Sequence, residues 1–272
     1  MKFSELKKFW RCKSWAFVQH GRPGHNSGKL EKYQWKGNDI YYRPSTSDVG
    51  VIYDILIHKS RPLHPDRTFF RNKQPEYWVP PAVDPAVILD IGGNIGITSV
   101  YYANLFPEAT IHTFEPVEDN YSILKKNISP YNNITAYNVG LGAKGGSVDI
   151  YQCNENGNAG GFSLYDLDTD KSKKQTISLR KADKFLLENN ILQPDLIKID
   201  TEGAEYDILS TLDPEMLSNV KWIIGELHGN KDFELLAYLS QWFDIDIQKN
   251  LDKRLSLFNA RNKSMSEVIP WH

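Results

Sequence analysis

One segment constrains the fold of this chain more than any other, the run VILDIGGNIGITS at residues 87–99. An apolar stretch leads into Asp90, and Gly92, Gly93 and Gly96 follow before the next apolar residues. This order predicts a buried strand, a tight turn and a helix whose first backbone N–H groups face a ligand. We interpret the glycines as positions where a Cβ would block the approach of the backbone to that ligand.

The chain beyond residue 85 alternates short apolar runs with amphipathic ones, which predicts a mainly parallel sheet covered on both faces. The expected strands are residues 87–91, 110–114, 134–138, 196–200 and 221–226, and the expected helices are 96–106, 117–129, 181–190, 203–212 and 231–241. Residues 243–260 predict a closing antiparallel hairpin. We therefore expect an α/β, Rossmann-like sheet of seven strands, and this inventory resembles that of class I methyltransferases.

Composition divides the chain into two parts. Residues 1–84 mix charged, aromatic and Gly/Pro/Ser-rich stretches and predict an N-terminal extension, whereas 85–272 form the catalytic domain. The extension contains one good helix from residue 47, for which Asp48 is the expected cap. Residues 140–175 predict a long Gly/Asn-rich loop. We expect the extension and this loop to cover an acceptor.

The glycine spacing separates two classes of cofactor. Asn94 stands where the dinucleotide fingerprint has its second glycine, so an NAD pyrophosphate would meet a side chain. S-adenosylmethionine has no phosphate, and its methionine end suits a loop that offers amides and the acid Asp90. Glu115 ends the next strand, where it can bind both ribose hydroxyls, and Asn138 closes the third strand near the expected adenine edge. The alternative is that the glycines only form a turn and Glu115 is a solvated acid.

A second set of polar residues follows the fourth strand, in PDLIKIDTEGAEYDIL. Lys198 lies inside a strand that should be apolar, so it needs a carboxylate partner. Asp200 and Glu202 come at the carboxyl edge of the sheet, where open α/β domains bind ligands. Acids in a first helical turn also stabilise the helix dipole, which alone accounts for Glu202 and Glu205 equally well.

The fifth strand delivers Glu226 and His228 to the same edge. Attack of an alcohol on a methyl group is helped by a base, and a histidine with an ordinary pKa near 6.5 is mostly neutral at pH 7 and can accept that proton. The alternative is a loop histidine bonded to the backbone. Asp200, Glu202, Glu226 and His228 also leave open a divalent cation such as Mg²⁺ or Mn²⁺, although we assign no metal ligand.

The chain resembles the FkbM family of S-adenosylmethionine-dependent methyltransferases in the motifs DIGGNIG, FEP, KIDTEGAEYDIL and GELHG. The resemblance implies O-methylation of a hydroxyl on a glycan or natural product. It implies these cofactor-binding residues: Asp90, Gly92, Asn94, Gly96 and Glu115. It also places these residues near the reacting centre: Asp200, Glu202 and Glu226. Upstream, YYRPSTSDVGVIYDIL is similar to the family's lead-in, with an Arg and an Asp matched by Arg43 and Asp48.

Charge and length narrow the partners. The formal charge is −2, with no obvious basic stripe, so we expect a small-molecule or saccharide acceptor and no nucleic acid. No apolar run is long enough to span a bilayer, and the charged N-terminus lacks a secretory signal, so a cytoplasmic location is expected. A non-catalytic Rossmann-like binding module and an RNA ribose methyltransferase remain as alternatives.

Overall fold

The centre of the computed structural model, which describes residues 3–25, 28–58, 83–153, 162–163, 169–249 and 256–265, is a seven-stranded sheet. Its order is β12-β13-β11-β10-β3-β4-β5, in which β13 runs antiparallel to both of its neighbours and the other pairs are parallel. The strands are β3 Val87–Ile91, β4 Thr110–Phe114, β5 Ile134–Tyr137, β10 Leu196–Ile199, β11 Trp222–Leu227, β12 Phe243–Lys249 and β13 Ser256–Asn262. The predicted Rossmann-like sheet with its antiparallel C-terminal pair is confirmed.

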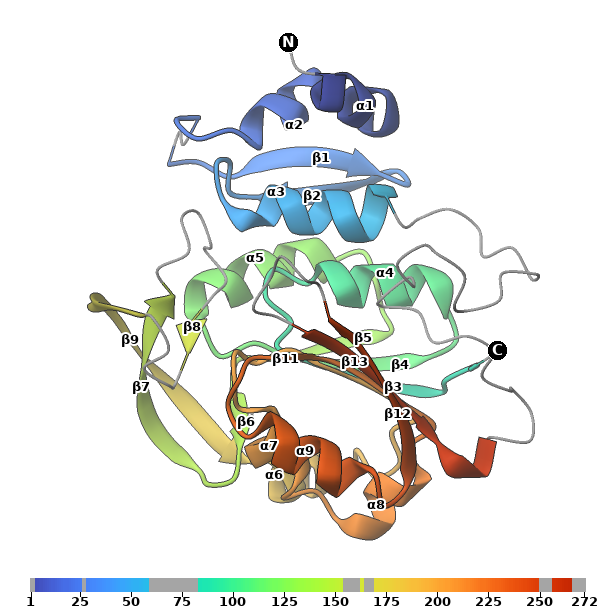
Figure 1. The fold of residues 1–272 in the computed structure, drawn as a ribbon. Coiled ribbons are helices and arrows are strands. Elements are labelled where there is room, and N and C mark those ends of the chain that lie inside the picture. The colour runs from blue at the N-terminus through green and yellow to red at the C-terminus, as the bar shows by residue number, and fades with distance from the viewer. Residues whose placement is uncertain are drawn as a thin grey trace.

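Helices cover both faces of this sheet (Figure 1). One face carries α4 Ile97–Leu105 and α5 Glu118–Ile128, and the other carries α6 Ala182–Glu188, α7 Glu205–Leu209, α8 Pro214–Asn219 and α9 Asp232–Leu239. Central strands are apolar because both of their sides are buried. Helix α8 was not among the predicted helices, although Asp213 caps it and Pro214 stands in its first turn, which is a recognisable start signal.

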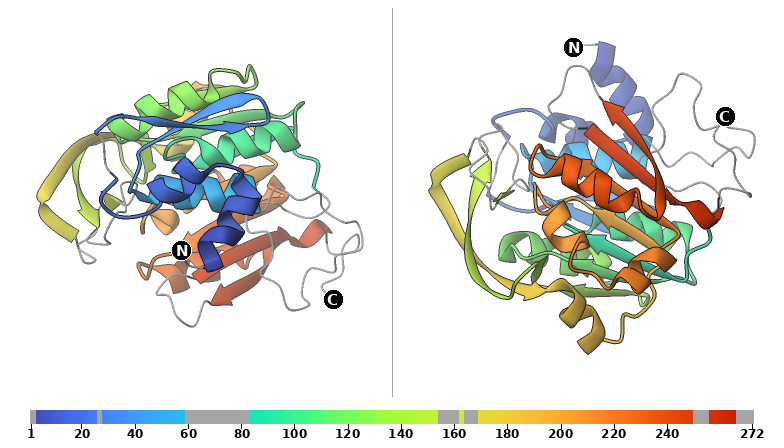
Figure 2. Two further views of the ribbon diagram at one scale, coloured as in Figure 1. Left: turned by 90° about the horizontal axis from the view of Figure 1, so that it is seen from above. Right: turned by 60° about the horizontal axis from the view of Figure 1, so that its bottom comes forward.

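The segment at residues 140–175 is not the long loop that the sequence predicted. It contains β6 Gly140–Gly142, β7 Gly146–Cys153, β8 Phe162–Ser163 and the start of β9 Thr169–Lys181, in the order β6-β9-β7-β8. This small sheet projects from one edge of the molecule (Figure 2). Ile150 and Ile177 alternate with polar residues and are buried with Val117, a period-two pattern that the Gly/Asn composition obscured. The glycine-rich residues 154–161 and residues 164–168 lie outside the described residues.

The N-terminal region lies against α4 and α5 (Figure 1). Its elements are α1 Phe3–Cys12, α2 Trp15–His20, β1 Glu31–Trp35, β2 Asn38–Tyr42 and α3 Ser47–Ile52, which continues as the π-helical turn Tyr53–His58. Buried residues of both parts, such as Ile40 and Val100, belong to one hydrophobic cluster. The extension therefore shares a core with the sheet domain.

The predicted helix from residue 47 exists, but Asp48 is not its cap. Thr46 is the capping residue, since its side chain accepts a hydrogen bond from the Asp48 backbone N–H at 3.2 Å. The fully buried Asp48 carboxylate instead accepts two hydrogen bonds from the Arg43 guanidinium, at 2.8 and 2.9 Å. A buried charge needs such a partner, which explains why Asp48 faces inward.

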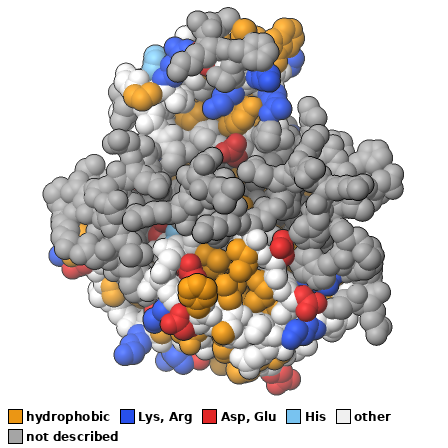
Figure 3. Space-filling model, viewed as in Figure 1, with side chains coloured by type: hydrophobic (Ala, Val, Ile, Leu, Met, Phe, Trp, Pro, Cys, Tyr) orange, Lys and Arg blue, Asp and Glu red, His pale blue; other side chains and the backbone are white. Residues whose placement is uncertain are grey.

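The described part of the surface carries hydrophobic, acidic and basic side chains (Figure 3). On the face shown in Figure 3, hydrophobic side chains gather in one area below the grey atoms, with acidic side chains at its margin. Among the described residues, none of the helices is long and apolar enough to cross a membrane.

Candidate functional site

The glycine loop, residues 92–96, turns the chain from β3 into α4. Gly92 has a φ of +83°, and a Cβ there would lie 1.8 Å from the Asp200 carbonyl oxygen. Cβ atoms on Gly93 and Gly96 would meet Thr113 at 2.2 Å and Leu124 at 3.1 Å, respectively. Contacts within the protein itself therefore require these glycines, and their role in the approach of a ligand stays a prediction.

Asn94 takes a left-handed backbone conformation, with φ at +49°, that asparagine tolerates better than most residues. This conformation lets its backbone N–H donate to Glu115 Oε2 at 2.8 Å. The Val117 N–H and the Asn120 side chain donate to the other carboxylate oxygen, at 2.9 and 3.4 Å. The loop and its neighbours thus hold the Glu115 carboxylate in one orientation. Burial nevertheless raises the pKa of Glu115 to about 7.

Lys198 has the carboxylate partner that its place in a buried strand requires. Its Nζ lies 3.2 Å from Asp90 Oδ1 and donates to the Gly92 carbonyl at 2.6 Å. Asp90 also accepts from the Ser99 hydroxyl at 2.6 Å. Burial alone would lower the pKa of Lys198, but the charges of Asp90 and Asp200 outweigh it and raise that pKa. The Asp90–Lys198 pair therefore anchors the glycine loop through the hydrogen bond from Lys198 to the Gly92 carbonyl.

We call Asp200, Glu202 and Glu226 the acidic edge, because they cluster where β10 and β11 end. Asp200 follows β10, and its backbone N–H donates to the Ile91 carbonyl at 3.0 Å. Glu202 has a left-handed φ of +55°, a conformation that costs a non-glycine residue about 1 kcal/mol or more and is enriched at functional sites. Glu226 lies within β11.

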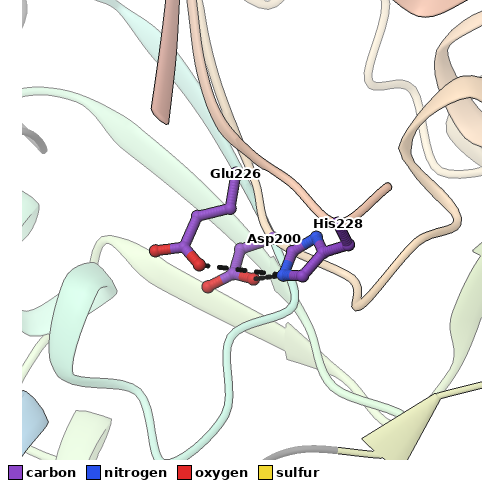
Figure 4. A group of neighbouring side chains, drawn as sticks. All are labelled: Asp200, Glu226 and His228. Atoms are coloured by element: carbon purple, nitrogen blue, oxygen red, sulfur yellow. Dashed lines mark ion pairs between the residues drawn. The ribbon is translucent and has the colours of Figure 1, made fainter. Parts of the chain in front are cut away.

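His228 is the centre of this cluster (Figure 4). Its Nδ1 lies 3.0 Å from Glu205 Oε1, and its Nε2 lies 3.6 Å from Asp200, 3.5 Å from Glu202 and 3.7 Å from Glu226. Glu205 is buried and also accepts hydrogen bonds from the Thr201 and Gly203 backbone N–H groups. Sequence reasoning left Glu205 out of the candidate site, although its position in TEGAEY was a usable signal.

The charge state of His228 differs from the expectation. Burial disfavours the cation, but the hydrogen bond to Glu205 and the nearby charges outweigh it and raise the pKa of His228 to about 10. The prediction of a neutral histidine is therefore wrong, because the imidazole is protonated near neutral pH and is not ready to accept a proton. For Glu226, burial and then the charge of Asp200 raise the pKa to about 8.

A pocket of about 280 Å³ brings the glycine loop and the acidic edge together. Six predicted site residues line it: Gly92, Asn94, Glu115, Asp200, Glu202 and Glu226. Residues outside the predicted set also line the pocket. They include Ser47 and Val51 of α3, Pro116 and Val117, Val139 to Leu141, and Ile150, Ile177 and Leu179 of the small sheet. Sequence reasoning missed the small-sheet residues because it did not recognise the strands that carry them.

Six predicted residues lie outside the pocket lining: Asp90, Gly93, Gly96, Asn138, Lys198 and His228. Asn138 follows the end of β5, and its amide donates to Glu118 on α5, whereas its neighbours Val139 and Gly140 reach the lining. Gly93 and Gly96 pack against protein side chains. The remaining three support residues that do line the pocket.

The divalent cation that the sequence left open is not supported. One ligand atom from each of Asp200, Glu226 and His228 lies within 4.8 Å of the others, but acidic groups commonly cluster without an ion. The ring nitrogen that faces the carboxylates would have to lose its proton to bind a metal. We therefore treat these residues as a charge cluster.

The chain is similar to several proteins that are named methyltransferases. The chain is 29% identical over 197 residues to Methyltransferase 1 of Beauveria bassiana, covering 64% of this chain and 78% of that protein. It is 26% identical to the 2-O-methyltransferase NoeI of Sinorhizobium fredii, covering 56% and 66% of the two chains. It is 24% identical to the hexuronic acid methyltransferase AglP of Haloferax volcanii, covering 56% and 59%.

A family model matches more than half of the chain. The match runs over residues 90–255, from the aspartate before the glycine loop to the residue before β13, and its description is methyltransferase FkbM domain. It includes the glycine loop, Glu115, the small sheet and the whole acidic edge. This chain belongs to the FkbM methyltransferase family.

Proposed function

We propose that this protein binds S-adenosylmethionine and transfers its methyl group to a hydroxyl of a saccharide or natural-product acceptor. The observation that carries this proposal is the shared pocket, in which Gly92, Asn94 and Glu115 face the same space as Asp200 and Glu226. A methyl donor seated on the loop would have its reactive end beside the carboxylates.

The pocket has the groups that this cofactor needs. Glu115 is oriented by the loop and can accept hydrogen bonds from the ribose hydroxyls. Val117, Leu141 and Ile177 supply apolar walls for a purine. The acidic edge supplies negative charge for a sulfonium, and the sulfonium makes the methyl group electrophilic when the cofactor is bound. Membership in the FkbM family supports the same cofactor.

The residues of the chain suit transfer to oxygen. An alcohol is a weak nucleophile near neutral pH, so a carboxylate that accepts its proton as the new bond forms assists the reaction. Asp200 and Glu226 line the pocket, and Asp200, or Glu226 once it has lost its proton, provides such a carboxylate. The protonated His228 holds them in place and offsets their charge. We therefore move the proposed base from His228 to the acidic edge.

The acceptor class rests on two relatives, whose names specify 2-O-methylation and a hexuronic acid. We propose a saccharide hydroxyl on this ground. The N-terminal residues 1–84 would form part of the acceptor cap, because Ser47 and Val51 of α3 reach the pocket lining.

Calorimetry with S-adenosylhomocysteine tests the cofactor, and mass spectrometry tests the transfer. The protein is incubated with S-adenosylmethionine and a panel of glycosides, and products heavier by one methyl group are expected. Asp200→Asn should abolish the methylated products, whereas binding of S-adenosylhomocysteine should be retained. Absence of binding would contradict the whole proposal, whereas binding without any transfer across saccharide, natural-product and RNA acceptors would favour a binding module.

A further inference from the structure

The acidic edge has more carboxylates than its one facing histidine can satisfy. The Nε2 atom of His228 lies between 3.5 and 3.7 Å from Asp200, Glu202 and Glu226. One N–H group donates well to one acceptor, and the other ring nitrogen of His228 is engaged by Glu205. The edge therefore keeps negative charge that the histidine alone does not neutralise.

The charged groups around Glu226 act in opposite directions. Asp200 and Glu202 repel its negative form, whereas His228 and Lys198 favour it. Lys198 is shared with Asp90 and the Gly92 carbonyl, and the Glu226 side chain is only 21% exposed. Burial and repulsion prevail and raise the pKa of Glu226 to about 8. Near pH 7 the cluster thus already holds an extra proton, in a pocket that the glycine loop also lines.

We propose, building on the proposed methyl transfer, that the acidic edge holds either the sulfonium of S-adenosylmethionine or a proton on Glu226, but not both at once. The sulfonium of S-adenosylmethionine expels a proton from Glu226 on binding, and Glu226 takes the proton of the acceptor hydroxyl when the methyl group is transferred.

The charges and atoms balance in this scheme. The hydroxyl oxygen forms a bond to the methyl carbon, the carbon–sulfur bond breaks with its electron pair left on sulfur, and the hydroxyl proton moves to the Glu226 carboxylate. A sulfonium and a carboxylate become a thioether and a carboxylic acid. The net charge of the edge is the same before and after transfer, so the transfer step adds no buried charge.

The scheme distinguishes the two forms of the cofactor. S-adenosylmethionine binding should release up to about 0.9 proton per site at pH 7, because a carboxyl group with a pKa of about 8 is mostly protonated there. The neutral thioether S-adenosylhomocysteine should not release that proton. The ratio of the two affinities should shift toward S-adenosylmethionine by up to tenfold per pH unit from pH 6 to 8 and level off above that. Because the two ligands share the same amino acid end, the effect of its titration cancels in the ratio of their affinities.

Calorimetry in phosphate and in Tris at pH 7 measures the protons released by each ligand, since the two buffers differ in ionisation enthalpy. Wild type should release more protons with S-adenosylmethionine than with S-adenosylhomocysteine. Glu226→Gln should abolish this difference and flatten the affinity ratio between pH 6 and 8. Glu234→Gln, an exposed substitution on α9, should behave as wild type.

The possible results separate a failure of the inference from a failure of the assignment to Glu226 and from a failure of the proposed function. Equal proton release by the two ligands in wild type overturns the inference, and that measurement does not depend on the folding of any variant. A difference that persists in Glu226→Gln overturns the assignment to Glu226. Failure of both ligands to bind contradicts the proposed function instead.

Discussion

The carboxamide of Asn127 on α5 pairs with both backbone polar groups of Tyr41 on β2. It accepts from the Tyr41 N–H at 2.7 Å and donates to the Tyr41 carbonyl at 3.0 Å. The same amide nitrogen donates to the Ile95 carbonyl at 2.8 Å, within the glycine loop. The fully buried Asn127 side chain thus makes the hydrogen bonds to Tyr41 that a neighbouring strand would make, and it joins the hairpin of β1 and β2 to the glycine loop.

Replacing Asn127 should loosen this connection. Asn127→Leu removes the partner of three backbone groups, of which the Ile95 carbonyl is buried and the two of Tyr41 are partly buried, and a buried group left unpaired costs about 1 to 3 kcal/mol. We expect a loss of at least about 2 kcal/mol of unfolding free energy and faster hydrogen exchange at the Tyr41 amide. Asn189→Ala removes an exposed helix-end amide and should cost under about 1 kcal/mol. Unchanged exchange at Tyr41 would contradict the connection.

Gly92 and Gly229 form a matched pair for the steric role of the glycine loop. Both have a positive φ, at +83° and +87°, but only a Cβ on Gly92 would meet another atom within 4 Å. Gly92→Ala should therefore destabilise the protein by about 1 to 3 kcal/mol more than Gly229→Ala, the usual cost of overpacking. Urea denaturation of both variants measures this, and equal losses would show that only backbone strain matters.

Lys198→Met should be strongly destabilising, because it leaves Asp90 buried without its charged partner. Removing one member of a buried pair costs about 3 to 5 kcal/mol. Lys221→Met is the control, since Lys221 pairs with Asp195 at 2.7 Å but is 44% exposed, and its loss should cost at most about 1 kcal/mol. Denaturant midpoints report the difference, and similar losses would mean that the Lys198 pair contributes no more than a surface one.

Glu115→Gln should weaken S-adenosylhomocysteine binding by about 1 to 3 kcal/mol, the range for a lost charged hydrogen-bond partner. The wild-type affinity should rise with pH through about 7, because the ionised carboxylate is the better acceptor. Glu108→Gln changes an exposed acid away from the pocket and serves as the control. An unaltered affinity in Glu115→Gln would assign the ribose contact to another residue.

His228 makes the stability of the protein depend on pH. The pKa of His228 is raised from 6.5 to about 10, so its stabilisation is fully present below pH 6.5 and is lost as the pH rises toward 10. His228→Gln should cost about 3 kcal/mol at pH 6, with the deficit shrinking by pH 9.5.

His112 provides the opposite control for this pH dependence. Burial lowers the pKa of His112, so its contribution is lost as the pH falls. The deficit of His112→Gln should therefore shrink toward low pH. A deficit of His228→Gln that stays constant from pH 6 to 9.5 in urea titrations would contradict a protonated His228.

The sheet and the two motifs that meet at its edge could be predicted from local sequence patterns. The order of apolar runs specifies parallel strands, and parallel strands deliver the residues at their carboxyl ends to one edge, so the glycine loop, Glu115 and Asp200 could be placed together. The need of Lys198 for a carboxylate also followed from its position in a buried strand.

The ionisation and the surroundings of these groups depend on contacts that exist only in the folded chain. The pKa of His228 depends on its distances to Glu205, Asp200 and Glu202, which come from the segment after β10, and no spacing in the sequence states those distances. The glycines contact Asp200 after β10, Thr113 of β4 and Leu124 of α5, and part of the pocket wall comes from α3 and the small sheet. Such contacts join residues far apart in the chain, and local sequence patterns carry no information about them.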